Sequence, residues 1–422
     1  MTKQNKFFLH IKENYFANKL DFVILILIYL LPFFLITGPF LSDLSVVIIS
    51  IIFLLKTFYH NLFRKFFYNK FSIFFFIFYI YIVFLSFLSN NIILSLESSL
   101  FFVRFLVFII AVKYIFQTIK DFNYFFLIIL CSVFVIVCFD GFFQLVFNKN
   151  IFMQVNESNR LILFTTNEWI LGSYLSRLLP LIFACAFLNK IHNKFFIFLA
   201  FLLLILVDVL VFTSGERAAL FYLMLSTLYI LILASKFKII RIVSIIFSTL
   251  IIILFILLDP SIKHRMIDHT AKQIGIGTNT MNIFSVNHQA HYLVAYNMFL
   301  SKPLTGYGPK MFREVCLNKE FEKYKGCSTH PHNYAMQLLS ETGILGFTFY
   351  LIIIISIFWK SFKALVNKYI YNKNIYSDFK ICILAAILVA IWPLIPTGSV
   401  FNNWLSIINF LPVGFYLATN KY

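Results

Sequence analysis

The fold is decided by residues 195–235, which read FFIFLAFLLLILVDVLVFTSGERAALFYLMLSTLYILILAS. Two apolar runs, 195–213 and 218–235, are each long enough to cross the hydrocarbon core of a bilayer as a helix. Only a short polar break at 214–217 separates them. Because lipid offers the backbone no hydrogen-bond partners, the pattern predicts two helices joined inside or at the edge of a membrane.

The same pattern extends over all 422 residues, of which 61% are hydrophobic and only 12% charged. This composition excludes a soluble globular domain, a disordered chain and a nucleic-acid-binding module. It predicts an all-α integral membrane protein with about twelve transmembrane helices, forming a single membrane domain over 1–422. The predicted spans are 21–37, 44–60, 71–89, 98–116, 122–140, 169–189, 195–213, 218–235, 242–258, 336–358, 380–396 and 403–419.

The positive charge follows the spans. The chain has a formal net charge of +18, and more than half of its 35 Lys and Arg residues lie at the two termini or after every second span. The opposite short loops 38–43, 89–97 and 397–402 contain none. The positive-inside rule therefore predicts that both termini are cytoplasmic. No small-residue cleavage site follows the first apolar run, so we expect that run to remain as a span.

Two segments on the opposite, outward side are too long to be turns, 141–168 and 259–335. Basic residues outnumber acidic ones in 259–335, against the positive-inside trend. One interpretation is an anionic partner on this face, such as a phosphate or pyrophosphate. The other is that a long loop escapes the charge rule.

Two of the six cysteines, Cys316 and Cys327, lie in this outward loop. If the loop faces the bacterial periplasm, a disulfide between them is expected. A metal site that includes the nearby His330 and His332 is the alternative.

The stretch Thr329-His330-Pro331-His332-Asn333-Tyr334 ends the outward loop and enters the tenth predicted span, which carries Glu341. An imidazole at the boundary between membrane and water can act as a general base near neutral pH. The alternative is a pair of interfacial histidines without a chemical role.

The break at 214–219 places Arg217 at membrane depth, which is costly unless the guanidinium lines a cavity or meets an anion. The alternative is an ion pair with Glu216 or a helix-capping role. Arg104, Arg177 and Asp208 lie within predicted spans, and such charges mark a cavity or pathway by default.

A third polar stretch contains His288 and His291, followed by the turn sequence PLTGYG at 303–308. A Gly-x-Gly that follows no strand and precedes no Lys-Ser/Thr pair does not indicate a nucleotide loop. Arg265 and Arg313 lie in the same loop and could contribute to an anion site.

Together these features resemble the O-antigen ligase and polymerase superfamily of lipid-linked glycan transferases. The resemblance rests on the outward Ser-Gly-Glu-Arg-Ala break, the large loop between the ninth and tenth spans, and His-x-His-Asn with Glu-x-Gly-x-x-Gly downstream. The Pro-x-x-Gly-x-Gly turn is similar to the family's own. One departure is His288, where many members carry Arg.

The resemblance implies transfer of a glycan from undecaprenyl pyrophosphate to a sugar hydroxyl of lipid A-core, at the periplasmic face of the bacterial inner membrane. It implies no nucleotide, metal or other cofactor. Arg217 would bind the pyrophosphate, with help from Arg265 and with His288 in doubt. The resemblance also implies a general base, which would be His332 in preference to His330. Asn333, Glu341 and Glu216 would be supporting residues.

Three other functions remain open. A polymerase would join lipid-linked repeat units, but no Gly lies eleven residues after Arg160, Arg265 or Arg313, which mildly favours a ligase. A ligase that glycosylates protein is a further possibility. A transporter of the lipid-linked glycan would be expected to carry charge in both halves of its central spans, whereas here the unusual polar residues gather at one face.

Overall fold

The computed structural model describes residues 10–14, 18–155, 160–164, 168–189, 193–274, 276 and 282–419. These ranges are helical and contain no named strand, only an isolated bridge between Lys149 and Val155. The predicted all-α class is therefore confirmed. The helices are α2 (Lys19–Ile36), α3 (Pro39–Tyr59), α4 (Phe63–Phe67), α5 (Lys70–Phe87), α6 (Ile92–Ser99), η1 (Leu100–Phe102), α7 (Val103–Thr118), α8 (Phe122–Phe147), α9 (Leu171–Leu188), α10 (Lys194–Thr213), α11 (Arg217–Leu233), α12 (Lys238–Leu258), α13 (Pro260–Lys263), η2 (His264–Asp268), α14 (His269–Ile274), α15 (Val286–Ser301), α16 (Phe312–Val315), α17 (Lys319–Glu322), α18 (Tyr334–Tyr369), α19 (Asp378–Ala390) and α20 (Asn403–Ala418).

Each of the twelve predicted segments coincides with a helix. In the described part of the chain, nine helices are long and apolar enough to cross a membrane, with α6, η1 and α7 counted as one. Helices α11, α19 and α20 have 17, 13 and 16 residues and are shorter. The helices indicate a multi-pass membrane protein, but the number twelve is not confirmed, and the orientation with both termini cytoplasmic stays a prediction.

Three predicted span ends were wrong, and the largest difference is at α18, which continues to Tyr369, eleven residues beyond the predicted end at 358. Helix α8 continues to Phe147, seven residues beyond the predicted end at 140, so the outward segment that follows it is shorter than expected. Helix α19 ends at Ala390, not at 396. The segment after it contains Pro393 and Pro396, which lack the backbone N–H that a continuing helix needs.

Asparagine side chains fix the starts of several helices. Asn69, Asn91 and Asn402 each accept a hydrogen bond from a backbone N–H three residues later, at 3.1, 3.1 and 2.9 Å. A side-chain oxygen at the N-cap satisfies one of the four N–H groups that a helix leaves unpaired. These contacts show how the Asn-rich sequence starts apolar helices sharply at polar boundaries.

Two buried ion pairs join spans inside the main core. Lys56 on α3 contacts Asp21 on α2, and Arg241 on α12 contacts Asp208 on α10 at 2.7 and 2.9 Å. The sequence analysis took Asp208 as a mark of a cavity. In both pairs the two charges lie on neighbouring helices, so they hold helices together instead.

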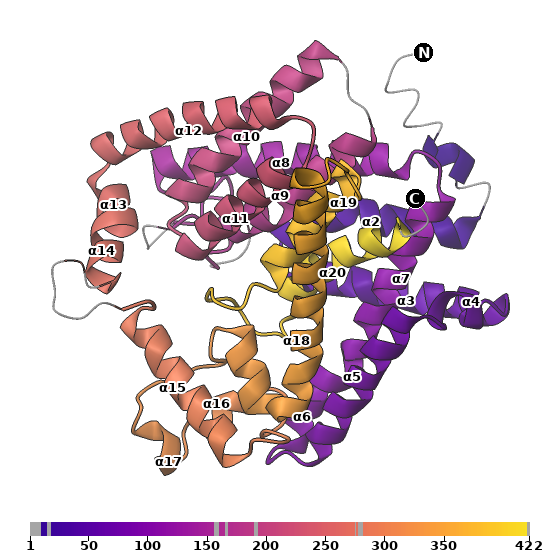
Figure 1. Ribbon diagram of the computed structural model, residues 1–422, viewed down its shortest axis with the longest axis vertical. Helices are drawn as coiled ribbons and strands as arrows, with labels where there is room; N and C mark the ends of the chain where they lie inside the picture. Colours follow the sequence, from indigo (N-terminus) through magenta and orange to yellow (C-terminus); the bar gives the residue numbers. More distant parts are fainter. Residues whose placement is uncertain are drawn as a thin grey trace.

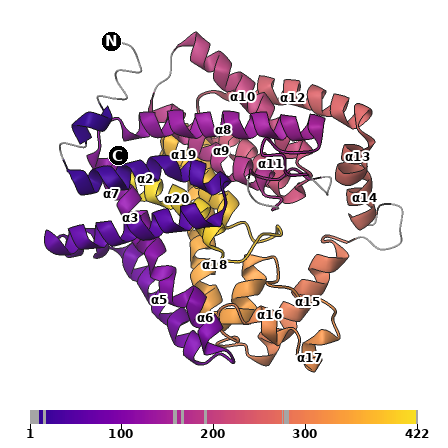
Figure 2. The same cartoon turned by 180° about the vertical axis from the view of Figure 1, so that it is seen from behind.

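The loop 259–335, predicted to face outward, builds a small core of its own. Val294, Met298, Phe312, Val315 and Phe321 form a buried cluster separate from the main one. In both views α15, α16 and α17 lie together at the bottom of the molecule, near α6 and away from α10 and α12 (Figures 1 and 2). The part of the loop from α15 to α17 is therefore a folded unit that can hold functional side chains in fixed positions.

The turn at 303–308 docks against a kink in α18. Gly343 interrupts the helix with φ +63°, and the N–H of Gly308 donates to the carbonyl of Glu341 at 2.7 Å. A Cβ on Gly343 would lie 2.3 Å from the Leu304 carbonyl oxygen, and a Cβ on Gly306 would lie 2.5 Å from the Glu341 carbonyl carbon. Only glycine allows both the left-handed backbone and this close approach.

Candidate functional site

The backbone around His332 is held in an uncommon conformation. His332 has φ +54°, in the left-handed region that costs a non-glycine residue free energy. The N–H of Thr397 donates to the His332 carbonyl at 2.8 Å. The next residue, Asn333, caps α18 by accepting from the Met336 N–H at 3.1 Å and donates from Nδ2 to the Pro393 carbonyl at 2.7 Å. The 391–402 segment therefore fixes how His332 is presented.

Four histidines from two distant stretches meet at this point, and we call them the histidine cluster: His288, His291, His330 and His332. The ring centroid of His332 lies 5.7 Å from that of His288, 5.3 Å from that of His291 and 4.1 Å from that of His330. His288 and His291 are three residues apart on α15 and so share one face of that helix. The sequence analysis gave no role to His291, although this spacing was a usable signal.

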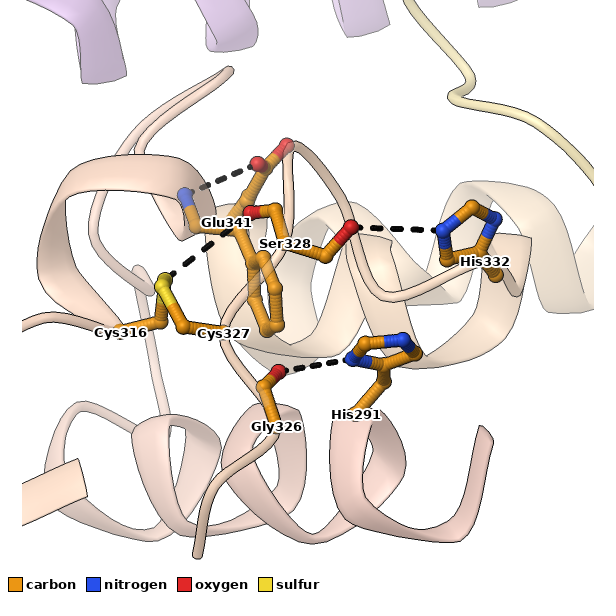
Figure 3. Close-up of a disulfide and its surroundings, with 8 residues drawn as sticks. His291, Cys316, Gly326, Cys327, Ser328, His332 and Glu341 are labelled. Atoms are coloured by element: carbon orange, nitrogen blue, oxygen red, sulfur yellow. Dashed lines mark hydrogen bonds between the residues drawn. A yellow bond between two sulfur atoms is a disulfide. The ribbon is translucent and has the colours of Figure 1, made fainter. Parts of the chain in front are cut away.

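A disulfide loop holds two members of the cluster, as Figure 3 shows. Cys316 and Cys327, the predicted pair, are bonded with their Cα atoms 5.1 Å apart. Next to Cys327, the Gly326 carbonyl accepts from His291 Nδ1 at 2.8 Å, and Ser328 Oγ lies 3.3 Å from His332 Nε2. Because a carbonyl can only accept, Nδ1 of His291 carries the proton, and its Nε2 is a free acceptor when the ring is neutral.

Three members of the cluster, His288, His330 and His332, have a lowered pKa, which favours their neutral form. Burial lowers the pKa of His330 to about 3, and burial together with the neighbouring His291 and His288 lowers the pKa of His332 to about 4. Burial, followed by the charges of His291 and Arg217, also lowers the pKa of His288. Neutral imidazoles can accept a proton, which is what a general base requires.

The Ser-Gly-Glu-Arg break joins three elements. Glu216 accepts from the N–H groups of Gly172 and Ser173 at the start of α9, at 2.6 and 3.1 Å. Arg217 instead contacts Gln273 and, at 3.4 Å, Thr270. The alternative that Arg217 pairs with Glu216 is therefore wrong, because each side chain turns to a different helix.

Two predicted anion-binding residues lie near each other at this break. Arg265 Nε donates to the carbonyl of Gly215 at 3.0 Å, and Gly215 lies two residues before Arg217. The partners of Arg217 are an amide and a hydroxyl, both neutral, so its charge remains available to an anion. Arg217 does not contact His332 directly, but its charge acts on His288, and His288 lies against His332.

A cavity of about 960 Å³ opens beside the histidine cluster. His330 and His332 line it, and so does Ala218, the neighbour of Arg217. The charged residues of its lining are Asp43, Glu97, Arg104, Glu168, Arg177, Lys310 and Arg313. Arg104 and Arg177 were predicted to mark a cavity, and both line this one.

The sequence analysis missed the contribution of the 391–402 segment. Thr397 contacts both His332 and Arg177, and Gln337 joins the segment to Glu341 by donating to Ser399 Oγ and to the Glu341 carboxylate, both at 2.9 Å. Glu341 also accepts from the Phe312 N–H at 3.1 Å, which ties α16 to α18. The Pro-x-x-Pro-Thr-Gly sequence could have indicated an irregular segment here.

Four clustered histidines raise the question of a metal centre. Within the described ranges, no group of three or more His, Cys, Asp or Glu side chains is arranged to hold a metal ion. The rings of His288 and His332 are instead nearly perpendicular, at 88°.

Residues 198–351 match the family model of O-antigen ligase. The match covers less than half of the chain and supports the resemblance to the O-antigen ligase superfamily. A comparison with curated proteins finds no match to the chain. The matched region contains the Ser-Gly-Glu-Arg break, the disulfide and all four members of the histidine cluster, whereas Arg177 and the 391–402 segment lie outside it. Members of this family are glycosyltransferase-like enzymes whose substrates are lipid-linked glycans.

Proposed function

We propose that the protein is an O-antigen ligase that moves a glycan from undecaprenyl pyrophosphate to a sugar hydroxyl of lipid A-core. The reaction takes place at the periplasmic face of the bacterial inner membrane and needs no metal ion. The acceptor oxygen forms a bond to the anomeric carbon of the donor glycan. The bond from that carbon to the pyrophosphate oxygen breaks, and undecaprenyl pyrophosphate leaves. The hydroxyl proton passes to a histidine.

His332 is the proposed general base, and its position in the histidine cluster carries the proposal. It lines the cavity, contacts the other three rings and is held by Thr397 and Ser328. His330 also lines the cavity, and its ring centroid lies 4.1 Å from that of His332. His330 therefore helps to orient the base. A pyrophosphate bound beside His288 would raise the pKa of His332, so the base strengthens when the donor arrives.

Arg217 and Arg265 are the proposed binding residues for the donor pyrophosphate, with His288 between them and the base. Negative charge grows on the leaving pyrophosphate in the transition state, and fixed cations offset it. Glu216 supports this part of the site by anchoring the break to α9. Asn333 and Glu341 support the other part, because they fix the start of α18 and the attachment of α16.

The test is the lipopolysaccharide banding pattern of a ligase-deletion strain complemented with wild type, His332→Ala or Arg217→Ala. The proposal expects a ladder with wild type and its loss in both variants, with lipid-linked polymer accumulating. His264→Ala is the matched control, since His264 lies in the same loop with its side chain 74% exposed. Immunoblots of membranes establish that each variant is present.

Other outcomes would identify other functions. Core that carries a single repeat in the variants indicates a polymerase. Loss of outward lipid-linked glycan, with none accumulating at the periplasmic face, indicates a transporter. An unchanged ladder in both variants, with protein present, overturns the proposed site.

A further inference from the structure

Two arginines in the cavity form no direct ion pair among the described residues, although the charge of Arg313 acts on the buried Glu341 carboxylate. Among the described residues, Arg104 pairs with Asp43 at 2.8 Å, and Lys310 lies 3.6 Å from Glu97. No ion pair in the same ranges involves Arg177 or Arg313, which face the same space. Glu168 is the third carboxylate of the lining. The cavity therefore holds two guanidinium groups that are available to an anion.

Arg177 is buried and held by neutral groups. It is 4% exposed on α9, and its Nη1 and Nη2 donate to Asn409 Oδ1 at 3.2 Å and Thr397 Oγ1 at 3.0 Å. The ring of Tyr222 lies 4.4 Å from its guanidinium carbon. Its Nε is buried without a hydrogen-bond partner. A buried cation with an unsatisfied donor is costly in the empty site and is stabilised by a bound anion.

Arg313 is fixed close to the histidine cluster. It lies on α16, whose backbone is tied to Glu341 through the Phe312 N–H. Its Nε is also buried without a partner. Its positive charge is near enough to His330 to contribute to the lowered pKa of that histidine. Arg177 is connected to the histidine cluster through Thr397, which contacts both Arg177 and His332.

In the chain of contacts, the histidine cluster separates this pair from the proposed donor site. Arg217 acts on His288, His288 contacts His332, His332 contacts His330, and Arg313 acts on His330. In an in-line displacement the acceptor hydroxyl approaches the anomeric carbon from the side opposite the leaving pyrophosphate, and the base lies beside that hydroxyl. Since Arg217 and Arg265 are assigned to the donor, the cavity side is left for the acceptor.

We infer that Arg177 and Arg313 bind an anionic substituent, a phosphate or a carboxylate, of the acceptor glycan. The inference rests on the proposed function, because it assigns the second substrate of the same reaction. Arg presents a planar fork of donors that suits both anions. Binding this group would bring a nearby acceptor hydroxyl to His332 and orient it for attack.

The test uses the purified full-length protein in lipid nanodiscs, an undecaprenyl-pyrophosphate-linked glycan as donor, and lipid A-core as acceptor. The acceptor is supplied intact, after enzymatic dephosphorylation, or after amidation of its carboxylates, so that phosphate and carboxylate are distinguished. The variants are Arg313→Gln, Arg177→Gln and, to keep the charge, Arg313→Lys. Lys323→Gln is the matched control, an exposed cation of the same loop.

Arg313→Gln is expected to raise the KM for intact acceptor on the order of tenfold, the worth of one charged hydrogen bond. Its donor KM should change less than about twofold, a level set by the scatter of surface substitutions. Arg313→Lys should recover part of the loss. Removing the correct anion from the acceptor should raise the wild-type KM equally, and Arg313→Gln should then cause no further loss. Lys323→Gln should match wild type throughout.

An unchanged acceptor KM in Arg313→Gln, or a rise in donor KM instead, overturns the inference. Equal KM values for intact and both modified acceptors also overturn it. Direct binding of lipid A-core to the nanodiscs separates this inference from the proposed function. Binding that depends on Arg313, without any transfer by wild type, would refute the ligase proposal and keep the anion site. If Arg177→Gln fails to fold, Arg313→Gln still decides the result.

Discussion

His291 Nδ1 donates a hydrogen bond of 2.8 Å to the carbonyl of Gly326, the residue that precedes the disulfide partner Cys327. The contact joins α15 to the disulfide loop, and Ser328 on the other side of Cys327 contacts His332. One short segment thus positions two rings of the histidine cluster. The disulfide has a role beyond stability, since it keeps this segment in place.

The first prediction concerns that disulfide. Replacing Cys316 and Cys327 by Ser should lower the free energy of unfolding by about 2–4 kcal/mol, the usual worth of a disulfide. Glycan transfer should fall as well, because His291 and His332 lose fixed partners. The measurement is Tm and transfer rate in nanodiscs, with and without dithiothreitol. Cys131→Ala removes a free cysteine, and this variant should have the same Tm and transfer rate as wild type. Full activity after reduction would contradict the positioning role.

Acidification should destabilise the protein through His330 and His332. The pKa values of about 3 and about 4 lie below the ordinary value of 6.5, so the folded state binds fewer protons than the unfolded chain in this window. Their contribution to stability is present above pH 6.5 and is lost as the pH falls toward 4. Thermal unfolding from pH 8 to 4 measures this. The double variant His330→Gln/His332→Gln should show a flatter dependence, and an identical slope would refute the assignment.

Gly343 should tolerate no side chain. Gly343→Ala would place a Cβ 2.3 Å from the Leu304 carbonyl oxygen at φ +63°, which backbone atoms cannot relieve cheaply. We expect a loss of about 1–3 kcal/mol, the cost of a strained backbone position, and a fall in transfer because the turn at 303–308 supports α16. Gly141→Ala is the control, since its Cβ would meet only flexible Leu210 methyl groups at 2.9 and 3.1 Å. Equal Tm values for the two variants would contradict the close-contact argument.

The sequence predicted the helical class and the position of nearly every apolar helix, because hydropathy alone reports those features. It also singled out Arg217, which is costly at membrane depth, and the His330–His332 stretch, whose imidazoles can act as a general base. It could not assign partners. The Gly326 contact to His291 spans 35 residues, and the Thr397 contact to His332 crosses from another segment. Such pairings depend on tertiary packing, which local pattern does not encode.

The buried pair of Asp208 and Arg241 should be sensitive to the loss of one member. Asp208→Ala leaves the Arg241 guanidinium buried without its carboxylate and should cost about 3–5 kcal/mol. The double variant Asp208→Leu/Arg241→Met should recover much of this loss, because neither charge remains buried. Asp268→Ala, with a side chain that is 50% exposed, should leave Tm unchanged. A double variant as unstable as Asp208→Ala would show that packing, not charge, dominates there.

The identity of residue 288 should set the affinity for the donor. His288 lies between Arg217 and the base, and its lowered pKa leaves it neutral before the donor binds. His288→Leu should raise the donor KM about tenfold with little change in acceptor KM, since it removes a hydrogen-bonding ring beside the pyrophosphate. His288→Arg restores the residue that many family members carry and supplies a permanent cation, so the donor KM should fall below wild type. His264→Leu is the control, because that ring is exposed. If both substitutions at 288 leave the donor KM unchanged, the donor anion site is confined to Arg217 and Arg265, and His288 acts only through packing against His332.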